Sequence, residues 1–143
     1  MKHKISWKKK TCRFVDSGFV KKHVMNSLLD LNHGRIGKIE NLEPLTQLES
    51  LYLRWNMIKT IENLSNLGAT LRELELYDNQ ISKLENLDSL VNLEILDVSH
   101  NRLRKIEGLE NLTKLKKLYL VSNKITKIEN LSHLKVSMIS TIS

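Results

Sequence analysis

Three residues of this sequence, Asp97, Ser99 and His100, have the side chains of a serine-hydrolase triad. In such a triad the histidine lies between the serine and the carboxylate and relays a proton. The segment LEILDVS, which precedes His100, has the alternating pattern of a strand, so Asp97 and Ser99 share one face. His100 directly follows Ser99 and cannot lie between the two. These residues therefore predict no catalytic triad.

The histidines and the single cysteine predict no metal site. His33 and His100 hold equivalent places three repeat units apart, which is about 14 Å at the usual spacing of strands and too far for one ion. Cys12 alone excludes a disulfide framework and a cysteine-rich zinc site, and favours a reducing compartment. There is no glycine-rich phosphate loop. We therefore expect a protein that is not an enzyme and has no cofactor.

Length and composition are those of one soluble domain. The 143 residues are 41% hydrophobic and 27% charged, which are ordinary values for such a domain. No apolar run approaches the roughly 20 residues that span a bilayer, and MKHKISWKKK lacks the apolar stretch of a secretory signal. We expect an intracellular protein, in the nucleus, the cytoplasm or both, with no small-molecule substrate and no membrane as partner.

The formal net charge of +7 is unevenly distributed. Residues 1–25 contain eight Lys and Arg residues against Asp16 alone, whereas residues 26–143 contain 15 residues of each sign. We therefore expect a basic N-terminal extension over residues 1–25. One interpretation is a disordered, solvated leader. The other is a segment that attracts nucleic acid or an anionic membrane, or that serves as a nuclear address.

From residue 26 onward the sequence repeats every 22 residues as LxxLxLxxNxIxxIENLxxLxx, with one extra residue in the second unit. The five units begin at Asn26, Leu48, Leu71, Leu93 and Leu115. The ninth position is occupied by Gly34, Asn56, Asn79, Asn101 and Asn123. Self-similarity at this period is the signature of leucine-rich repeats, and it predicts a repeat domain over residues 26–136.

The residues of one unit have physical reasons for their positions. Leucines two residues apart point to the same side of a short strand, and a single unit cannot bury them, so the units must stack. The ninth-position asparagine can bond backbone groups of two adjoining coils, and the ENL asparagine can cap a short helix. The expected fold class is α/β: a right-handed leucine-rich-repeat solenoid (horseshoe) with a parallel β-sheet on its concave face and short helical or 3₁₀ turns on its convex face.

Acidic and aromatic side chains gather on the expected concave face. Positions 3, 5 and 7 of a unit project opposite to the leucines, and position 8 lies just past the strand. From the second unit onward, the acidic and aromatic residues at these positions form a cluster of Glu73, Glu75, Asp78, Asp97, Tyr52, Trp55, Tyr77 and Tyr119. Exposed Tyr and Trp are typical interface anchors, and unpaired carboxylates favour a basic partner surface.

Several stretches are more specific than a generic repeat, above all RELELYDNQI, LEILDVS and KKLYLVSNKI. Over residues 30–134 the sequence closely resembles the protein phosphatase 1 regulatory subunit 7 family, from the 22-residue subclass of leucine-rich-repeat proteins. The resemblance implies a non-catalytic regulator whose concave face binds the protein phosphatase 1 catalytic subunit. Asp97 in LEILDVS and Tyr119 in KKLYLVS match two of the family's contact positions. The expected partner-binding residues are Asp97, Tyr119, Glu75, Tyr77, Trp55 and Asp78.

The sequence departs from that family at both ends. Family members normally have an acidic leader, and they continue for several more repeats to a C-terminal cap. A sixth unit would place leucines at positions where Ser137, Ser140 and Ile142 stand, so we expect a truncation after about five repeats and an irregular tail at 137–143 that lacks a proper cap. A slip of one residue would bring Ile139 into the strand pattern. An edge of this kind also favours self-association through the C-terminal end.

Other functions stay open at this point. The scaffold could belong to another assembly, either a ribonucleoprotein particle or a ciliary or cytoskeletal complex. Nucleic-acid binding would rest on the basic leader only, because the charges of the body balance, and it would depend steeply on salt.

Overall fold

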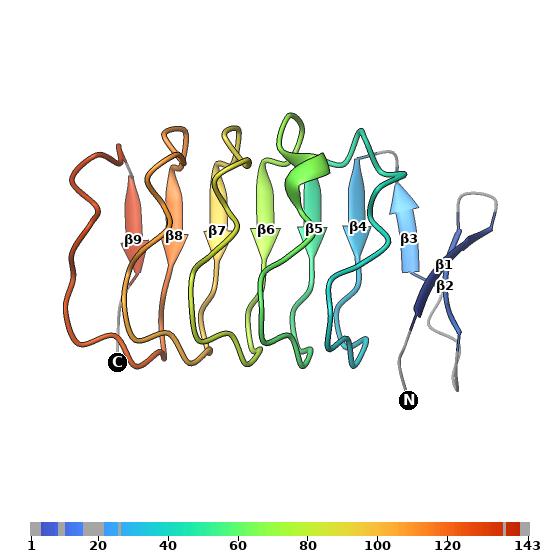
Figure 1. Ribbon diagram of the computed structural model, residues 1–143, viewed down its shortest axis with the longest axis horizontal. Helices are drawn as coiled ribbons and strands as arrows, with labels where there is room; N and C mark the ends of the chain where they lie inside the picture. The colour runs from blue at the N-terminus through green and yellow to red at the C-terminus, as the bar shows by residue number, and fades with distance from the viewer. Residues whose placement is uncertain (1–3, 9–10, 16–21, 26, 136, 141–143) are drawn as a thin grey trace.

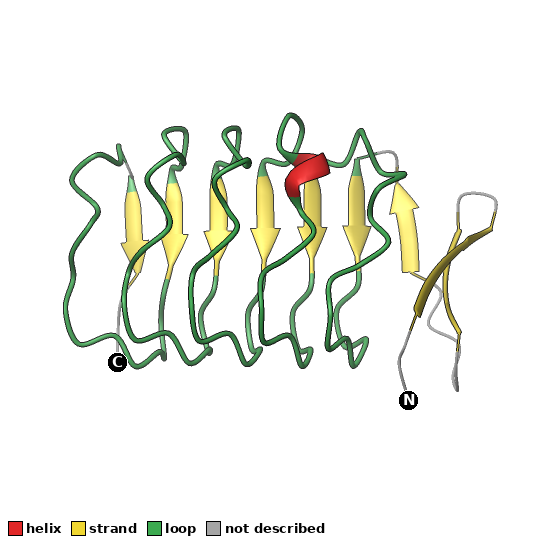
Figure 2. Cartoon of the chain, in the orientation of Figure 1, coloured by secondary structure: helices red, strands yellow, loops and turns green. Residues whose placement is uncertain are grey.

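The computed structural model of the protein describes residues 4–8, 11–15, 22–25, 27–135 and 137–140. The strands form one sheet in chain order, and Figure 1 shows them side by side along the molecule. They are β1 (Lys4–Lys8), β2 (Thr11–Val15), β3 (Lys22–Met25), β4 (Leu28–Asp30), β5 (Ser50–Tyr52), β6 (Glu73–Glu75), β7 (Ile95–Asp97), β8 (Lys117–Tyr119) and β9 (Met138–Ser140). Among the described residues the one helix is the 3₁₀ helix η1 (Ser65–Leu67), and Figure 2 shows loops over most of the remainder.

The strands β4 to β9 are parallel, and each belongs to one turn of a solenoid. Their central residues stand opposite one another in the order Leu29, Leu51, Leu74, Leu96, Leu118 and Ile139. From β4 to β8 each step in this row is 22 or 23 residues long, so one period of the sequence makes one turn. The predicted solenoid with a parallel sheet is therefore confirmed.

The apolar residues of the repeat form one continuous core. The strand residues Leu51, Leu74 and Leu96 are completely buried, and so are Ile58 and Ile81 in the coils that follow β5 and β6. Burial of one such side chain contributes about 1.5–3 kcal/mol. Because the neighbouring turns supply the cover, no single turn is stable alone.

A ladder of buried and half-buried asparagines links each turn to the turn before it. The side-chain amide of Asn79 donates to the carbonyl oxygens of Leu53 (2.9 Å) and Leu76 (3.0 Å), and its oxygen accepts the backbone N–H of Ile58 (3.0 Å). The same pattern recurs at Asn56, Asn101 and Asn123. Each asparagine thus pairs backbone groups that the inward bend would otherwise bury without partners, as the sequence predicts.

The convex side consists mostly of turns rather than the helices expected after each ENL sequence. At η1 the residue in the N-cap position is Leu64, and it makes no side-chain capping bond. The asparagines Asn63, Asn86 and Asn130 have a φ of 59°. Each donates to an isoleucine carbonyl oxygen of the preceding turn at 2.7 Å. The prediction that these asparagines cap helices is therefore wrong: they form a second ladder, in a left-handed conformation that asparagine tolerates better than most residues.

The N-terminal leader contains strands in its described parts. β1 pairs with β2, β2 with β3, and β3 with β4, all antiparallel. The pairing of Val24 with Leu29 joins the leader to the first turn of the solenoid. The interpretation of a disordered leader is therefore wrong for residues 4–8, 11–15 and 22–25, whereas the domain boundaries stay predictions.

The chain rejoins the sheet as β9, although its sequence lacks the leucines of the repeat. Ile139 stands opposite Leu118, where an unbroken 22-residue period would place Ser140. The predicted slip of one residue is therefore confirmed. β9 is not part of an irregular tail, and residues 141–143 lie outside the described part. The cover is partial, because Ile139 is 40% exposed and Ile128, in the preceding turn, is 58% exposed.

Replacing Asn79 with alanine tests the asparagine ladder. Asn79→Ala should lower the free energy of unfolding by about 3 kcal/mol, because several hydrogen bonds worth about 1 kcal/mol each disappear and the buried Ile58 N–H loses its partner. Urea titration followed by circular dichroism measures the loss. The matched control is Asn92→Ala, whose amide bonds the Ala69 carbonyl at an exposed site, and it should cost less than about 1 kcal/mol. Equal losses would contradict a special role for the ladder.

Candidate functional site

The strands β5 to β8 turn alternate side chains away from the core and form a surface that we call the sheet face. In each strand the central leucine is buried, so its two neighbours project to the opposite side. These neighbours form two rows, namely Ser50, Glu73, Ile95 and Lys117, and Tyr52, Glu75, Asp97 and Tyr119. Because paired strands lie about 4.8 Å apart, Asp97 has Glu75 on one side and Tyr119 on the other.

Glu75 is the buried acid of the sheet face. It is only 8% exposed, and its Oε1 accepts a hydrogen bond from Nη2 of Arg54 at 2.5 Å. Burial raises the pKa of Glu75, the ion pair with Arg54 opposes this rise, and the charges of Glu73 and Asp97 add to it. The same hydrogen bond raises the pKa of Arg54, whose Nε is buried without a partner. Arg54 therefore offsets the negative charge of the second row.

Glu73 is also engaged within the sheet face. Its Oε2 accepts hydrogen bonds from the Tyr52 hydroxyl (2.9 Å) and the Ser50 hydroxyl (3.3 Å). Burial, followed by the hydrogen bond to Glu73, raises the pKa of Tyr52 to about 12. The prediction of unpaired carboxylates is therefore wrong for Glu73 and Glu75. From the sequence, Arg54 was not paired with Glu75, although a cation just past β5 and an acid on the adjacent strand β6 could have signalled the ion pair.

Asp97 is the acid of the second row that remains open to a partner. Its Oδ1 accepts the backbone N–H of Ser99 at 2.9 Å. Its other carboxylate oxygen has no hydrogen-bond donor among the described residues. The bond to Ser99 N–H fixes the orientation of the carboxylate, and nothing in it resembles the proton relay of a hydrolase.

Four rings form a continuous stack, which we call the ring ladder, just past the ends of β4 to β7. His33 stacks on Trp55 with centroids 4.3 Å apart and planes 9° apart. Tyr77 meets the edge of Trp55 at 5.6 Å and lies 4.7 Å from His100. The two histidines are thus separated by two rings, and they do not form a shared metal site. The recurrence of His, Trp and His at position 8 of the repeat is the sequence signal that could have predicted this stack.

Five of the six predicted contact residues fall into two groups. Glu75, Asp97 and Tyr119 share one row of the sheet face. Trp55 and Tyr77 belong to the ring ladder, in which Trp55 is 41% exposed. The sixth, Asp78, is exposed in the turn that follows Tyr77 and has a φ of 53°.

Two other kinds of site do not occur among the described residues. No group of three or more His, Cys, Asp or Glu side chains there could hold a metal ion. Across the same part of the chain, no helix has the length and apolar character needed to cross a membrane.

Comparison with known proteins agrees with this geometry. The crystal structure of internalin C2 from Listeria monocytogenes superposes with a TM-score of 0.75 and 29% identity, over 81% of this chain and 51% of that chain. A profile of the family described as Leucine Rich repeats (2 copies) matches residues 69–111 and 91–135. The chain has the leucine-rich-repeat fold.

Among leucine-rich-repeat proteins, this chain is similar to two curated relatives that are named as regulatory subunits of protein phosphatase 1. Protein phosphatase 1 regulatory subunit 7 of Xenopus tropicalis is 58% identical over 48 residues, which are 34% of this chain and 14% of the relative. A protein phosphatase 1 regulatory inhibitor subunit homologue of Arabidopsis thaliana is 38% identical over 92 residues, 64% of this chain and 28% of the relative. The resemblance predicted from the sequence is confirmed over these stretches. The chain spans less than a third of the length of either relative.

Replacing Glu75 with glutamine tests the balance between burial and the Arg54 ion pair. The pKa of Glu75 in the folded protein is raised above its ordinary value of 4.5. The protonated side chain therefore contributes its full stabilisation of the fold below pH 4.5, and this contribution is lost as the pH rises through the folded-state pKa. The free energy of unfolding of the wild type, minus that of Glu75→Gln, should therefore fall as the pH rises above 4.5. Urea titrations from pH 4.5 upward measure the difference.

The control for this titration is Glu110→Gln, which changes an exposed glutamate outside the strands. Its difference from the wild type should stay flat over the same range. A difference for Glu75→Gln that rises with pH would contradict our assignment, because the ion pair with Arg54 would then outweigh burial.

Proposed function

We propose that this chain is a non-catalytic regulatory subunit that binds the catalytic subunit of protein phosphatase 1 through the sheet face. The observation that carries the proposal is the row Glu75, Asp97 and Tyr119 on three neighbouring strands. It occurs in a chain whose relatives are named as regulatory subunits of that phosphatase. Extended surfaces of stacked repeats are suited to binding another protein.

Asp97 and Tyr119 are the side chains that we expect to contribute most. The bond from the Ser99 N–H holds the Asp97 carboxylate in place and leaves one oxygen for a lysine or arginine of the partner. Tyr119 is half-buried beside it and offers an aromatic ring with a polar tip, which is a frequent anchor at interfaces. Adjacent acid and ring together fit a basic surface that also has apolar patches.

The other four predicted contacts act around this centre. Glu75 holds Arg54 in place rather than meeting a partner directly, because it is buried. Tyr77 and Trp55 present the ring ladder at the edge of the sheet face, and Asp78 adds an exposed negative charge beside them. The proposal includes localisation in the nucleus, the cytoplasm or both, because the chain must be in the same compartment as the phosphatase to bind it.

The double variant Asp97→Lys, Tyr119→Ala tests the proposed surface. Its affinity for the recombinant phosphatase catalytic subunit should fall at least about tenfold, because a charge of the wrong sign replaces a desolvated acid and an aromatic anchor is removed. Biolayer interferometry with the full chain immobilised measures the affinity. The control, Glu110→Lys with Thr113→Ala, makes the same change of charge, and also one truncation to alanine, at exposed positions of a solvent-facing loop.

Three outcomes of the binding experiment distinguish the alternatives. Weaker binding by the sheet-face variant with an unchanged control supports the proposal. Equal weakening in both variants would mean that net charge, not the sheet face, governs binding. No binding by the wild-type chain would exclude the phosphatase as a partner of this chain, and a different scaffold function would follow.

A second proposal concerns self-association through β9. This strand pairs with β8 on one side and has no described strand on the other. Met138 and Ile139 on β9, with Ile128 in the preceding turn, are exposed apolar side chains. An open strand edge beside apolar surface pairs readily with another chain, so we expect two copies to associate at this end.

The Ile139→Lys variant tests this association. A lysine on an edge strand disfavours pairing with another chain, so the weight-average mass at high concentration should fall toward that of the monomer. Sedimentation equilibrium measures the mass, and Val91→Lys, at an exposed apolar residue outside the strands, is the control. A wild-type chain that stays monomeric throughout would overturn the proposal.

A further inference from the structure

The edge of the solenoid at which the parallel strands end carries a row of cations that the proposed function does not use. They occupy positions 10, 12 and 13 of the repeat, and all are exposed. We call this row the basic rim, and its members are Arg35, Lys38, Lys59, Lys83, Arg102, Arg104, Lys105, Lys124 and Lys127. They are nine of the fifteen Lys and Arg residues outside residues 1–25. Residues 26–143 have no net charge, but most of their cations lie at this one edge.

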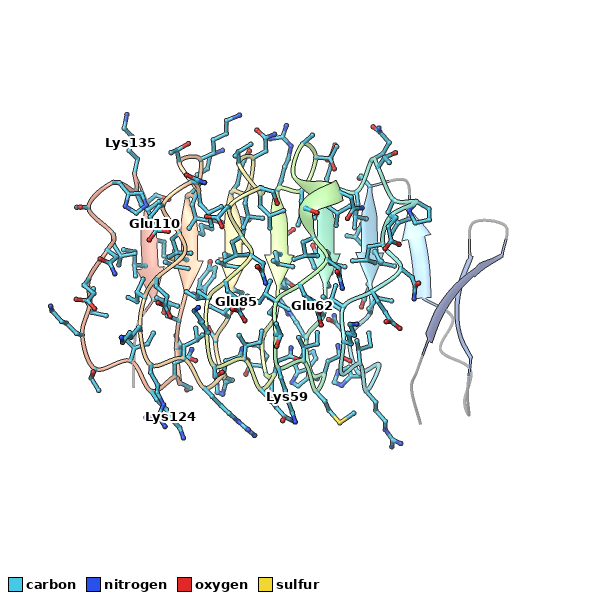
Figure 3. All side chains as sticks on the ribbon, in the orientation of Figure 1. Lys59, Glu62, Glu85, Glu110, Lys124 and Lys135 are labelled. Carbon is cyan, nitrogen blue, oxygen red and sulfur yellow. The ribbon has the colours of Figure 1, made fainter. Side chains whose placement is uncertain are left out.

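The backbone beneath the basic rim is held in register from turn to turn. The N–H of Arg102 donates to the carbonyl oxygen of Ile81, and that of Lys124 to the carbonyl oxygen of Leu103, both at 2.8 Å. Equivalent bonds join the other turns of this edge. Figure 3 shows Lys59 and Lys124 pointing away from the solenoid here, whereas Lys135 lies at the opposite edge. The rim is thus a fixed array with about 4.8 Å between turns.

Most cations of the basic rim have no acidic partner in the described part of the chain. The ion pairs within the rim are those of Lys83 with Glu85 (3.7 Å) and Lys127 with Glu129 (2.8 Å). The other seven cations have none among the described residues. At the opposite edge, by contrast, Glu94 holds both Arg72 and Lys116. The rim therefore presents unneutralised positive charge to solvent.

The chemistry of the basic rim favours one class of partner. Among the residues at positions 10, 12 and 13 of the repeat, Met57 is the one large apolar side chain that is exposed. Protein interfaces depend on apolar and aromatic anchors, and Met57 alone offers one at these positions. A nucleic-acid backbone needs none, since cations that displace condensed counterions from phosphates supply most of the affinity. The leader, which contains eight more Lys and Arg residues, joins the first turn of the solenoid through β3.

We propose that the basic rim binds the phosphate backbone of nucleic acid without reading its sequence. Seven unpaired cations spaced by the repeat contact successive phosphates. The rings of the ring ladder contact one another, and they take no part in this binding. This surface is separate from the sheet face and does not depend on phosphatase binding. From the sequence, nucleic-acid binding was open only as an alternative for the leader, and this proposal places it on the solenoid instead.

Fluorescence anisotropy with a labelled 20-nucleotide oligothymidylate and the full chain tests the proposal. The rim variant replaces Arg102, Arg104, Lys105 and Lys124 with glutamine. Its affinity should fall roughly tenfold or more. The slope of log affinity against log salt should decrease by about 3, because each cation that neutralises a phosphate of a single strand contributes about 0.7 to that slope.

Two variants of equal net charge serve as controls. The opposite-edge variant replaces Arg72, Lys114, Lys116 and Lys135 with glutamine, and the leader variant does the same to Lys2, Lys4, Lys8 and Lys9. The opposite-edge variant should keep its affinity within about threefold of the wild type, with the salt slope little changed. Circular dichroism establishes that every variant is folded.

Each outcome decides the proposal. A selective decrease of affinity in the rim variant supports it. An equal decrease in the opposite-edge variant would overturn it in favour of net charge, and a decrease confined to the leader variant would overturn it in favour of the leader alone. Stronger binding of polyglutamate than of the oligonucleotide would assign the rim to an acidic protein segment instead.

Discussion

The asparagine ladder is the interaction on which the rest of the structure depends. A chain that turns inward after every strand buries backbone groups that cannot reach a strand partner, and those groups must be paired. Asn56, Asn79, Asn101 and Asn123 pair them by bonding two turns at once. The first turn ends the ladder, because Gly34 stands there and its N–H donates to Asn56. Neighbouring turns are thereby held in one register, and the leucines become a continuous core.

Because the turns keep a fixed register, residues at the same position of each repeat unit lie in a row along the solenoid. Position 5 of the repeat becomes the row that contains Asp97 and Tyr119, positions 7 and 8 become the ring ladder, and positions 10, 12 and 13 become the basic rim. Nine of the fifteen cations outside the leader thus gather at one edge, apart from Asp97 and Tyr119. One scaffold can therefore offer two different surfaces without a second domain.

The sequence was most informative where every unit repeats the same physical requirement. The leucine rows and the ladder asparagines follow from the 22-residue period. The slip that brings Ile139 opposite Leu118 departs from that period and follows from the strand pattern of the apolar residues. Contacts between unlike positions of adjacent units, such as Arg54 with Glu75, were missed because periodicity does not specify how long side chains reach across strands. The left-handed turn at Asn63 was also missed, since the same residue type suits both a helix cap and a positive φ.

Amide hydrogen exchange measured by nuclear magnetic resonance tests the central role of the ladder most directly. The N–H groups of Ile58 and Ile81 lie outside the strands and donate to the ladder oxygens of Asn79 and Asn101. We predict that they exchange as slowly as the strand amides of β6, because both become accessible only when a whole turn opens. Exchange at the rate of exposed loop amides, with β6 still protected, would contradict the ladder's role.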